Sequence, residues 1–481
     1  MPISICIWLL PTVEGNGLVM LPLAITALLA ANVMLLLEDA SDNVLFLVFQ
    51  GTFFIFIAAG PLIDAFSGID FYESFAADVV RKTYTCYWLA AFALWWGCLY
   101  RAVRRGRPVF KRRDRAKEQG RAPIYDYEKI RLYAKILFYI AIAAYAAVTT
   151  DKILFRQTYS LGEYYATYGV ASRLPGIVVK IGDSHLIALT LFLAAKPSKE
   201  EARLPMLLFM LVSAMTLLYG VRNVVILNAL LLIVYFVSRN TQEETWLSRK
   251  ALWLGAVLSP VAVILLQAFD AIRRSVSFSV LEVREIFSLS LIRDFFVAQS
   301  VSSYILSNAI TYSDLLGGQP VPYTFGTLYT YLTQNMITRF FTGAAAYSSN
   351  SVESATYGAN LGSRLAYFLY PESYLNGVGM GGSYVADLFV DFSYAGVFLG
   401  TLLACLFAAK LTRVMRDKNS SPYALAFVLV AIRWFIYLPR DSCFAWAMQA
   451  FSIMNLLFVL AVWFVTRPKK PGKLRAGPIE T

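Results

Sequence analysis

Long stretches without a charged side chain constrain this chain more than any other feature of its sequence. Leu18–Leu37, Val44–Ile63 and Leu204–Tyr219 are three of them. A helix needs about 20 apolar residues to cross the hydrocarbon core of a bilayer, and it satisfies its own backbone hydrogen bonds there. Hydrophobic residues make up 58% of the sequence, above the roughly one half that is usual in soluble domains. The sequence therefore predicts an all-α, polytopic protein whose residues 1–481 form a single membrane domain.

About eleven helices are expected to cross the membrane, each needing about 20 residues. The predicted spans are Leu18–Leu37, Val44–Ile63, Tyr84–Tyr100, Leu132–Val148, Gly176–Ala195, Leu204–Tyr219, Val221–Val237, Ala251–Phe269, Tyr384–Lys410, Tyr423–Leu438 and Cys443–Thr466. The run Leu204–Val237 is too long for one span at about 1.5 Å per residue, so we place a turn at Tyr219-Gly220. Ile3–Leu10 is too short to cross alone and would add a twelfth segment as a half-helix.

Basic residues predict the orientation of these spans, because lysine and arginine concentrate on the cytoplasmic side of membrane proteins. Residues 101–131 hold 12 of them and are expected to form a basic cytoplasmic loop. Alternation then places four more basic segments on that side: 196–203, 239–250, 410–421 and the residues after Thr466. The five segments hold 27 of the 43 lysines and arginines. We therefore expect an external N-terminus and a cytoplasmic C-terminus.

The external side carries one long segment, residues 270–382, without an apolar run that could span the bilayer. Loops longer than about 12–15 residues are uncommon unless they are functional. Amphipathic helices at the interface are expected within it, for example Val283–Phe296 or Leu328–Phe341. The segment has six arginines and no lysine. Guanidinium groups bind phosphate and carboxylate through paired donors, so Arg273, Arg339 and Arg364 are candidate pyrophosphate ligands. The alternative is that they pair with acidic neighbours or lie along lipid.

Three further arginines lie at the external ends of predicted spans. Arg222 follows the turn at Gly220, and Arg433 and Arg440 bracket the end of the tenth span. A charge this close to the membrane is costly unless it has a partner or faces water. We predict that arginines of this set contact an anion, and a local ion pair of Arg440 with Asp441 is the alternative.

Three titratable groups are candidates for proton transfer. Asp387 and Asp391 are four residues apart, so they share one helical face near the external mouth of the ninth span. The dipole at a helix N-terminus would stabilise such carboxylates even without a catalytic role. His185 stands among Lys180 and Asp183 and could transfer a proton or make a structural hydrogen bond.

Several classes of function are disfavoured by composition. The net charge of +12 follows the predicted cytoplasmic loops, and no nucleic-acid-binding module is visible. The five cysteines form no CxxC pair, and His185 is the only histidine. No metal site, other cofactor or nucleic-acid partner is therefore expected.

One stretch resembles a known family. Residues 379–400, GMGGSYVADLFVDFSYAGVFLG, resemble the C-terminal signature of Wzy-type O-antigen and capsule polymerases, oligosaccharide repeat-unit polymerases. Tyr219-Gly-Val-Arg222 resembles the family's earlier Gly-x-Arg, and Arg440 its late arginine. The sequence departs from the pattern at Asp387, where glutamate is common, and at Ser393, where glycine is common.

The resemblance implies a fold like that of C-type membrane glycosyltransferases and a block-transfer reaction at the outer face of the bacterial cytoplasmic (inner) membrane. A growing glycan would pass from undecaprenyl pyrophosphate to the non-reducing end of the next lipid-linked repeat unit, building O-antigen or capsule without a metal. Arginines, foremost Arg222, Arg433 and Arg440, would neutralise the leaving pyrophosphate. Asp387, Asp391 or His185 would deprotonate the acceptor hydroxyl. A chain-length regulator protein is a further candidate partner.

Three other functions stay open at this point. An O-antigen ligase has nearly the same topology. A polyprenyl-phosphate-sugar glycosyltransferase often has acidic residues in its first external loop, where this chain has Asp64, Asp70 and Glu73. A polysaccharide or lipid transporter belongs to a different class, and such proteins tend to show internal repeats, which are not visible in this sequence.

Overall fold

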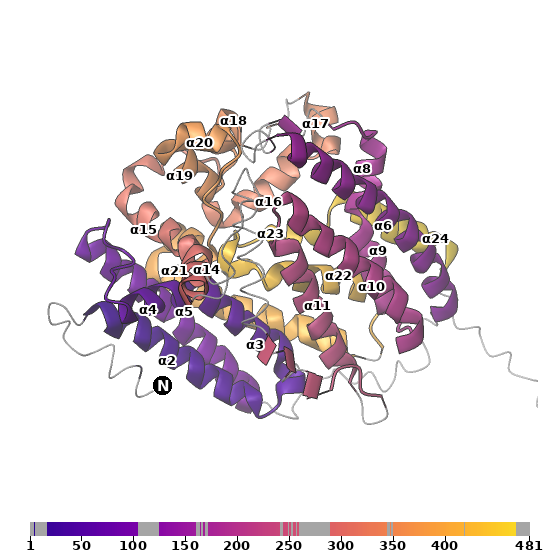
Figure 1. Ribbon diagram of the computed structural model, residues 1–481, viewed down its shortest axis with the longest axis horizontal. Coiled ribbons are helices and arrows are strands. Elements are labelled where there is room, and N and C mark those ends of the chain that lie inside the picture. The colour runs from indigo at the N-terminus through magenta and orange to yellow at the C-terminus, as the bar shows by residue number, and fades with distance from the viewer. Residues whose placement is uncertain are drawn as a thin grey trace, which may run out of the picture.

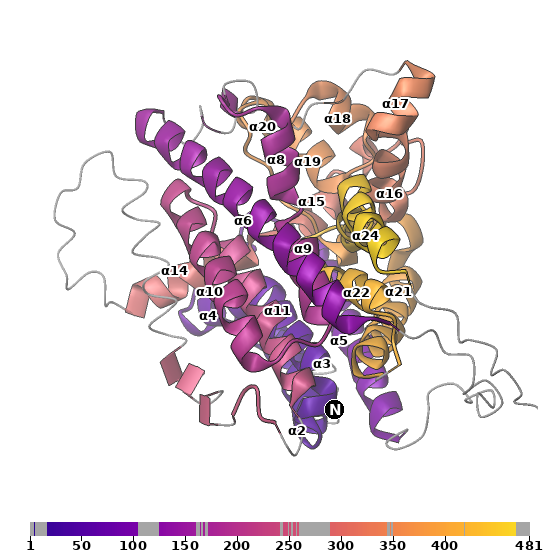
Figure 2. The ribbon, with the colours of Figure 1, turned by 90° about the vertical axis from the view of Figure 1, so that its right-hand side faces the viewer.

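The computed structural model describes residues 17–103, 125–159, 172–240, 289–343, 350–417 and 419–467, with residue 4 and short pieces of 164–168, 244–258 and 347. All regular structure in these residues is helical, as Figures 1 and 2 show. The predicted all-α class is confirmed. The predicted span Ala251–Phe269, the segment Ile3–Leu10, the centre of the basic loop 101–131 and Arg273 fall largely or wholly outside the described residues.

The first group of helices lies at the lower left of Figure 1. It comprises α2 (Gly17–Leu37), α3 (Ala40–Phe53), a π-helical turn η1 (Phe54–Ala58), α4 (Ala59–Phe66) and α5 (Ala77–Val103). The helices α3, η1 and α4 follow one another without a gap, so they form the single span predicted there. Helix α2 packs against α5.

The second group lies at the right of Figure 1 and includes two helices from the C-terminal part of the chain. It comprises α6 (Tyr127–Thr158), α8 (Gly176–Asp183), α9 (His185–Ala194), α10 (Lys199–Met215), the 3-10 turn η3 (Thr216–Tyr219), α11 (Asn223–Arg239), α22 (Pro422–Phe435) and α24 (Ile453–Val465). Gly220 ends η3 with a φ of +98°, a conformation that glycine adopts at little cost. The predicted turn at Tyr219-Gly220 is confirmed.

Helix α21 (Tyr384–Arg416) is broken rather than straight. Ser393 has a φ of +57°, which interrupts the helix. The hydroxyl groups of Thr401 and Tyr384 are 3.4 Å apart, although a straight helix would separate these residues by about 25 Å at 1.5 Å per residue. The arm 384–392 therefore folds back on the long arm, and Leu388 reaches Gly400. Tyr384–Arg416 is one of the helical segments long and apolar enough to cross a membrane, as predicted for Tyr384–Lys410, but it is bent at Ser393.

The last predicted span, Cys443–Thr466, is also interrupted. Residues 445–450 form the short helix α23 (Ala445–Ala450), and α24 begins three residues later at Ile453. The Ser452 side chain accepts a hydrogen bond from the backbone N–H of Asn455, so it caps α24.

Short helices from the long segment that was predicted to be external lie from the centre to the upper left and top of Figure 1. They are α14 (Leu289–Ser300), η4 (Val301–Ser303), α15 (Tyr304–Thr311), η5 (Ser313–Leu315), α16 (Tyr323–Gln334), α17 (Met336–Thr342), α18 (Val352–Tyr357), α19 (Leu361–Leu369) and α20 (Pro371–Leu375). On α17, Phe340 and Phe341 are more than three-quarters exposed. The helix expected over Leu328–Phe341 is divided at Asn335 between α16 and α17.

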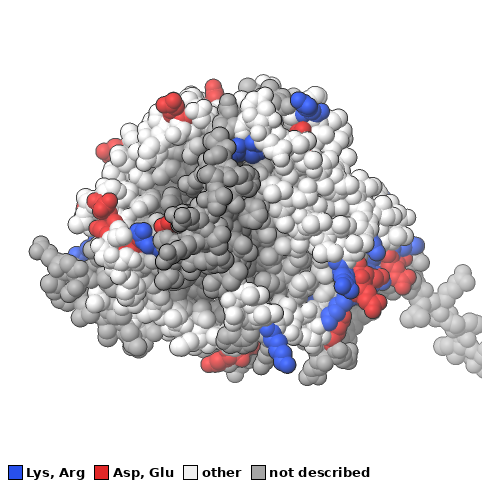
Figure 3. All heavy atoms as spheres, in the orientation of Figure 1, with Lys and Arg blue, Asp and Glu red and all other residues white. Residues whose placement is uncertain are grey.

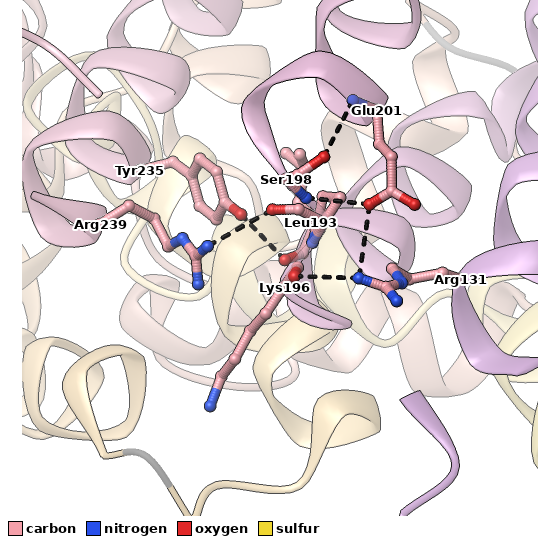
Figure 4. Close-up of polar contacts among 8 residues, drawn as sticks. Arg131, Leu193, Lys196, Ser198, Glu201, Tyr235 and Arg239 are labelled. Carbon is pink, nitrogen blue, oxygen red and sulfur yellow. Dashed lines mark hydrogen bonds and ion pairs between the residues drawn. The ribbon is translucent and has the colours of Figure 1, made fainter. Parts of the chain in front are cut away.

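Side-chain contacts define two opposite ends of the helix bundle. At the first, which we call the basic end, Arg101 on α5 donates to Asn43 at 2.8 Å, and Arg416 on α21 pairs with Asp42. Arg131 on α6 contacts Glu201 at 3.4 Å beside the α9–α10 turn (Figure 4), where Tyr235 donates to the carbonyl of Leu193 at 3.0 Å. These contacts join the flanks of the predicted cytoplasmic segments.

At the other end, which we call the loop end, Arg293 on α14 forms a 2.8 Å ion pair with Asp64 on α4. The Ser300 hydroxyl at the end of α14 accepts from the backbone N–H of Gly60 at 2.9 Å. The long segment is thus attached to the first group of helices, and the two ends agree with the predicted alternation of spans.

The outer surface of the bundle is that of a membrane protein. Six described helical segments are long and apolar enough to cross a membrane. On α10, Leu204, Leu207 and Leu211 are each more than half exposed, and their spacing of three and four places them on one face. On the described part of the face in Figure 3, a white area to the right of the grey atoms shows no charged side chain between the groups at the top and those at the lower right. Lipid is the environment that suits such a face.

Candidate functional site

Arg433 lies inside the bundle near the loop end of α22. Its side chain is buried, and its Nε donates to the Oδ1 atom of Asn228 on α11 at 2.6 Å. Asn228 in turn donates to the Ser213 hydroxyl on α10 at 2.8 Å. No carboxylate among the described residues forms an ion pair with Arg433. A buried cation held only by neutral groups is costly. An anion bound beside it would offset that cost.

His185 lies beside this arginine at the start of α9. Its ring stacks on Tyr145 of α6, with centroids 3.9 Å apart. Nδ1 lies 2.8 Å from the carbonyl oxygen of Gly182, so Nδ1 carries the proton and Nε2 is left as an acceptor. Arg433 is close enough to interact electrostatically with His185. The hydrogen bond to Gly182 is of the structural kind considered as the alternative to catalysis.

Tyr437 connects the three arginines predicted at the span ends. It lies near both Arg433 and Arg440, whose charges interact with it. Its hydroxyl accepts a 2.7 Å hydrogen bond from the side chain of Asn223, and Asn223 directly follows Arg222, the residue that precedes α11. The structure therefore brings α11, α22 and η6 (Leu438–Arg440) together at one place, and the three arginines come from these elements.

Arg440 is held by a neutral side chain rather than by a carboxylate. Its Nη1 donates to the Gln299 side-chain oxygen at 2.8 Å, and its guanidinium lies 5.5 Å from the centre of the Phe56 ring. The alternative pairing with Asp441 is not observed among the described residues. Arg440 thus resembles Arg433 in keeping its charge without a counter-ion.

The two aspartates on the folded-back arm of α21 both accept hydrogen bonds from backbone N–H groups. Asp387 is buried, and its Oδ2 accepts from Cys443 at 3.2 Å. Asp391 accepts from Tyr323 at 3.0 Å and from Thr324 at 2.6 Å. It therefore caps the first turn of α16, and both carboxylates fix chain segments at the loop end.

The remaining predicted arginines lie away from Tyr437. Arg364 on α19 donates to the carbonyl oxygens of Leu315 at 2.8 Å and Gly317 at 2.7 Å. Arg339 lies on the exposed helix α17. Arg273 lies outside the described residues. Of the predicted set, His185 interacts with Arg433, and Arg433 and Arg440 both interact with Tyr437. Arg222 is joined to this group through its chain neighbour Asn223, which donates to Tyr437.

The partners of the arginines were missed at the level of sequence. Asn228 gave one usable signal, since it is an amide inside the apolar run of α11, where a polar group needs a partner. Gln299 and Tyr437 gave none. Within the described residues, no group of three or more histidine, cysteine, aspartate or glutamate side chains is placed to hold a metal ion.

Fold and site together define a class: a multi-pass α-helical membrane protein in which a buried arginine, Arg433, and a partly buried one, Arg440, have no carboxylate partner among the described residues. A family profile described as O-antigen polysaccharide polymerase Wzy matches residues 2–470, nearly the whole chain, and the chain belongs to this family. The family polymerises O-antigen and acts on lipid-linked oligosaccharide repeat units. No curated protein and no solved structure matches the chain. The protein is thus a multi-pass inner-membrane polymerase of surface polysaccharide.

Proposed function

We propose that this protein joins undecaprenyl-pyrophosphate-linked repeat units by block transfer at the external face of the membrane. The growing glycan leaves its pyrophosphate carrier and is added to the non-reducing end of the next lipid-linked unit. Orientation is part of the proposal: the loop end faces outward, and the basic end and the C-terminus face the cytoplasm, as the distribution of basic residues favours.

One observation carries the proposal. Arg433 is buried and Arg440 partly buried, and each is held by a neutral amide side chain, Asn228 and Gln299 respectively, instead of by a carboxylate. An arginine in a dry site stabilises negative charge that develops on a leaving group far more strongly than it would in water. A departing lipid pyrophosphate is such a leaving group. Arg433, Arg440 and Arg222 would bind it beside Tyr437.

The three candidates for proton transfer, His185, Asp387 and Asp391, lie in different surroundings. His185 presents Nε2 as an acceptor near Arg433, so it is a candidate for proton transfer close to the pyrophosphate. Asp387 and Asp391 would act through the chain segments that they hold. Arg273, Arg339 and Arg364 would contribute to substrate binding through the long loop, which would gate the acceptor glycan.

The rival functions differ in what the structure supports. In a polyprenyl-phosphate-sugar enzyme, Asp64 and Asp70 would act in the first external loop. Asp64 is instead paired with Arg293, and Asp70 accepts from the backbone N–H of Tyr72 at 2.9 Å. An O-antigen ligase would use a similar site, so a polymerase and a ligase must be distinguished by the glycan that each one produces.

The test is to delete the gene and separate the surface polysaccharide on a gel. The proposal expects the ladder of chain lengths to collapse to a single repeat unit on its acceptor. Loss of all glycan from the acceptor would indicate a ligase, and an unchanged ladder would refute both. Restoration by the wild-type gene but not by Arg433→Gln would connect the product to the site.

A further inference from the structure

The segment between η6 and α23 is held in place from three directions. Asp387 accepts from the backbone N–H of Cys443, and Asn360 on α19 donates to the Ser442 hydroxyl at 3.4 Å. Gly382 lies so close that a Cβ there would be 3.0 Å from the backbone of Asp441 and Ser442. Residues 441–443 therefore form a preorganised loop that directly follows Arg440.

Asp441 is the acidic residue of this loop, and it differs from the two aspartates of α21. Its carboxylate is half-buried, and its Oδ1 accepts from the adjacent backbone N–H of Ser442 at 2.8 Å. No described residue donates to its Oδ2, and no described lysine or arginine pairs with it. Asp391 has both oxygens occupied and Asp387 is fully buried. Of the three, Asp441 combines incomplete burial with a carboxylate oxygen that has no donor among the described residues, and it directly follows Arg440 in the chain.

We propose that Asp441 is the general base that accepts the proton of the acceptor hydroxyl; this inference rests on the proposed function. The hydroxyl oxygen of the acceptor sugar forms a bond to the anomeric carbon of the donor glycan. The bond from that carbon to the pyrophosphate oxygen breaks, and its electron pair leaves with undecaprenyl pyrophosphate beside Arg440. The hydroxyl proton passes to Asp441 and then to water, which restores the carboxylate. Asp387 is a positioning residue, since it acts through Cys443.

The electrostatics of the loop suit this role. Burial raises the pKa of Asp441 to about 6, and a general base works best with a pKa near the operating pH. The titratable and charged groups around it are Asp387 on α21, Tyr437 at the end of α22, Cys443 in the same loop and the adjacent Arg440. The carboxylate is charged above pH 6 and protonated below it, so turnover should fall as the pH drops through 6.

The experiment uses the full chain in liposomes with synthetic undecaprenyl-pyrophosphate-linked repeat units, from pH 5 to pH 8. Wild type should elongate the glycan with an acidic limb near pH 6. Asp441→Asn should lower turnover about 100-fold or more, lose that limb, and bind undecaprenyl pyrophosphate as wild type does. Asp314→Asn, the same change at an exposed residue of η5, should match wild type.

Two results would overturn the inference. One is an Asp441→Asn variant with wild-type turnover and an unchanged acidic limb. The other applies if that variant does not fold: Asp441→Glu should then elongate the glycan with a displaced limb, and an unshifted limb excludes the role. An inactive wild type would instead refute the proposed function, so the two failures are distinguishable.

Discussion

Two sets of arginines lie toward the loop end, and they differ in what holds them. Arg433 and Arg440 donate to amide side chains and have no counter-ion among the described residues. Arg293 pairs with Asp64, and Arg364 donates to backbone carbonyls. An excess of arginine over lysine in this part of the sequence therefore does not by itself mark a binding site. The chemical type of the partner separates an arginine that is available to substrate from one that holds the fold.

The largest effect is expected from Arg433→Gln. Loss of a preorganised cation from a dry site should slow elongation by about 100- to 1000-fold. Removing a buried charge that lacks a counter-ion relieves its desolvation, so the melting temperature should not fall. Rate and melting temperature are measured on the same liposome and detergent preparations. A variant that loses stability but keeps its rate would place Arg433 with the structural set.

Arg440→Gln should come next. One charge-assisted hydrogen bond is worth roughly 1.5–3 kcal/mol, which corresponds to about a 10- to 100-fold loss of rate. Arg440→Lys should recover part of it, because it restores the charge without the planar donors. Equal rates for the glutamine and lysine variants would argue against an electrostatic role.

Arg364→Ala provides the contrast. It removes hydrogen bonds to Leu315 and Gly317, each worth about 1 kcal/mol. The melting temperature should therefore fall, while the elongation rate of the folded protein should change little. A rate loss as large as that of Arg433→Gln, at unchanged stability, would show that Arg364 also acts on substrate. The two sets of arginines would then not differ in role.

The smallest effect is expected from Tyr437→Phe. The ring stays and only the hydroxyl that accepts from Asn223 is lost. The expected change in rate is about fivefold, since an ordinary hydrogen bond is worth about 1 kcal/mol. An Asn223→Ala variant should give a similar loss, and the double variant should be no worse than either one. Fully additive losses would show that the pair does not act as a unit.

Much of the fold could be predicted because lipid imposes a simple rule on the sequence. Apolar runs such as Leu18–Leu37 became helices, and Gly220 marked the one turn inside the run Leu204–Val237. The break at Ser393 could not be predicted in this way. The residue at the break is neither glycine nor proline, and Gly396, the first glycine of the run, lies three residues beyond it. The folded-back arm depends on contacts such as that of Tyr384 with Thr401.

The arginines of the site could be predicted from the sequence, but the residues that hold them could not. Arg433 and Arg440 stand out as charges at the end of an apolar span, which is a local signal. Their partners Asn228 and Gln299 are 205 and 141 residues away in the chain, and no local pattern joins them. Asp391 shows the same limit. A dipole effect within its own helix was the expected alternative, whereas it caps α16 from across the fold.

The most direct measurement is elongation by the purified protein in liposomes that contain only lipid-linked repeat units. The account predicts a ladder of products, with one undecaprenyl pyrophosphate released for each new glycosidic bond and no nucleotide sugar required. Repeat units that stay unjoined under these conditions, or that join only when a nucleotide sugar is added, would contradict it.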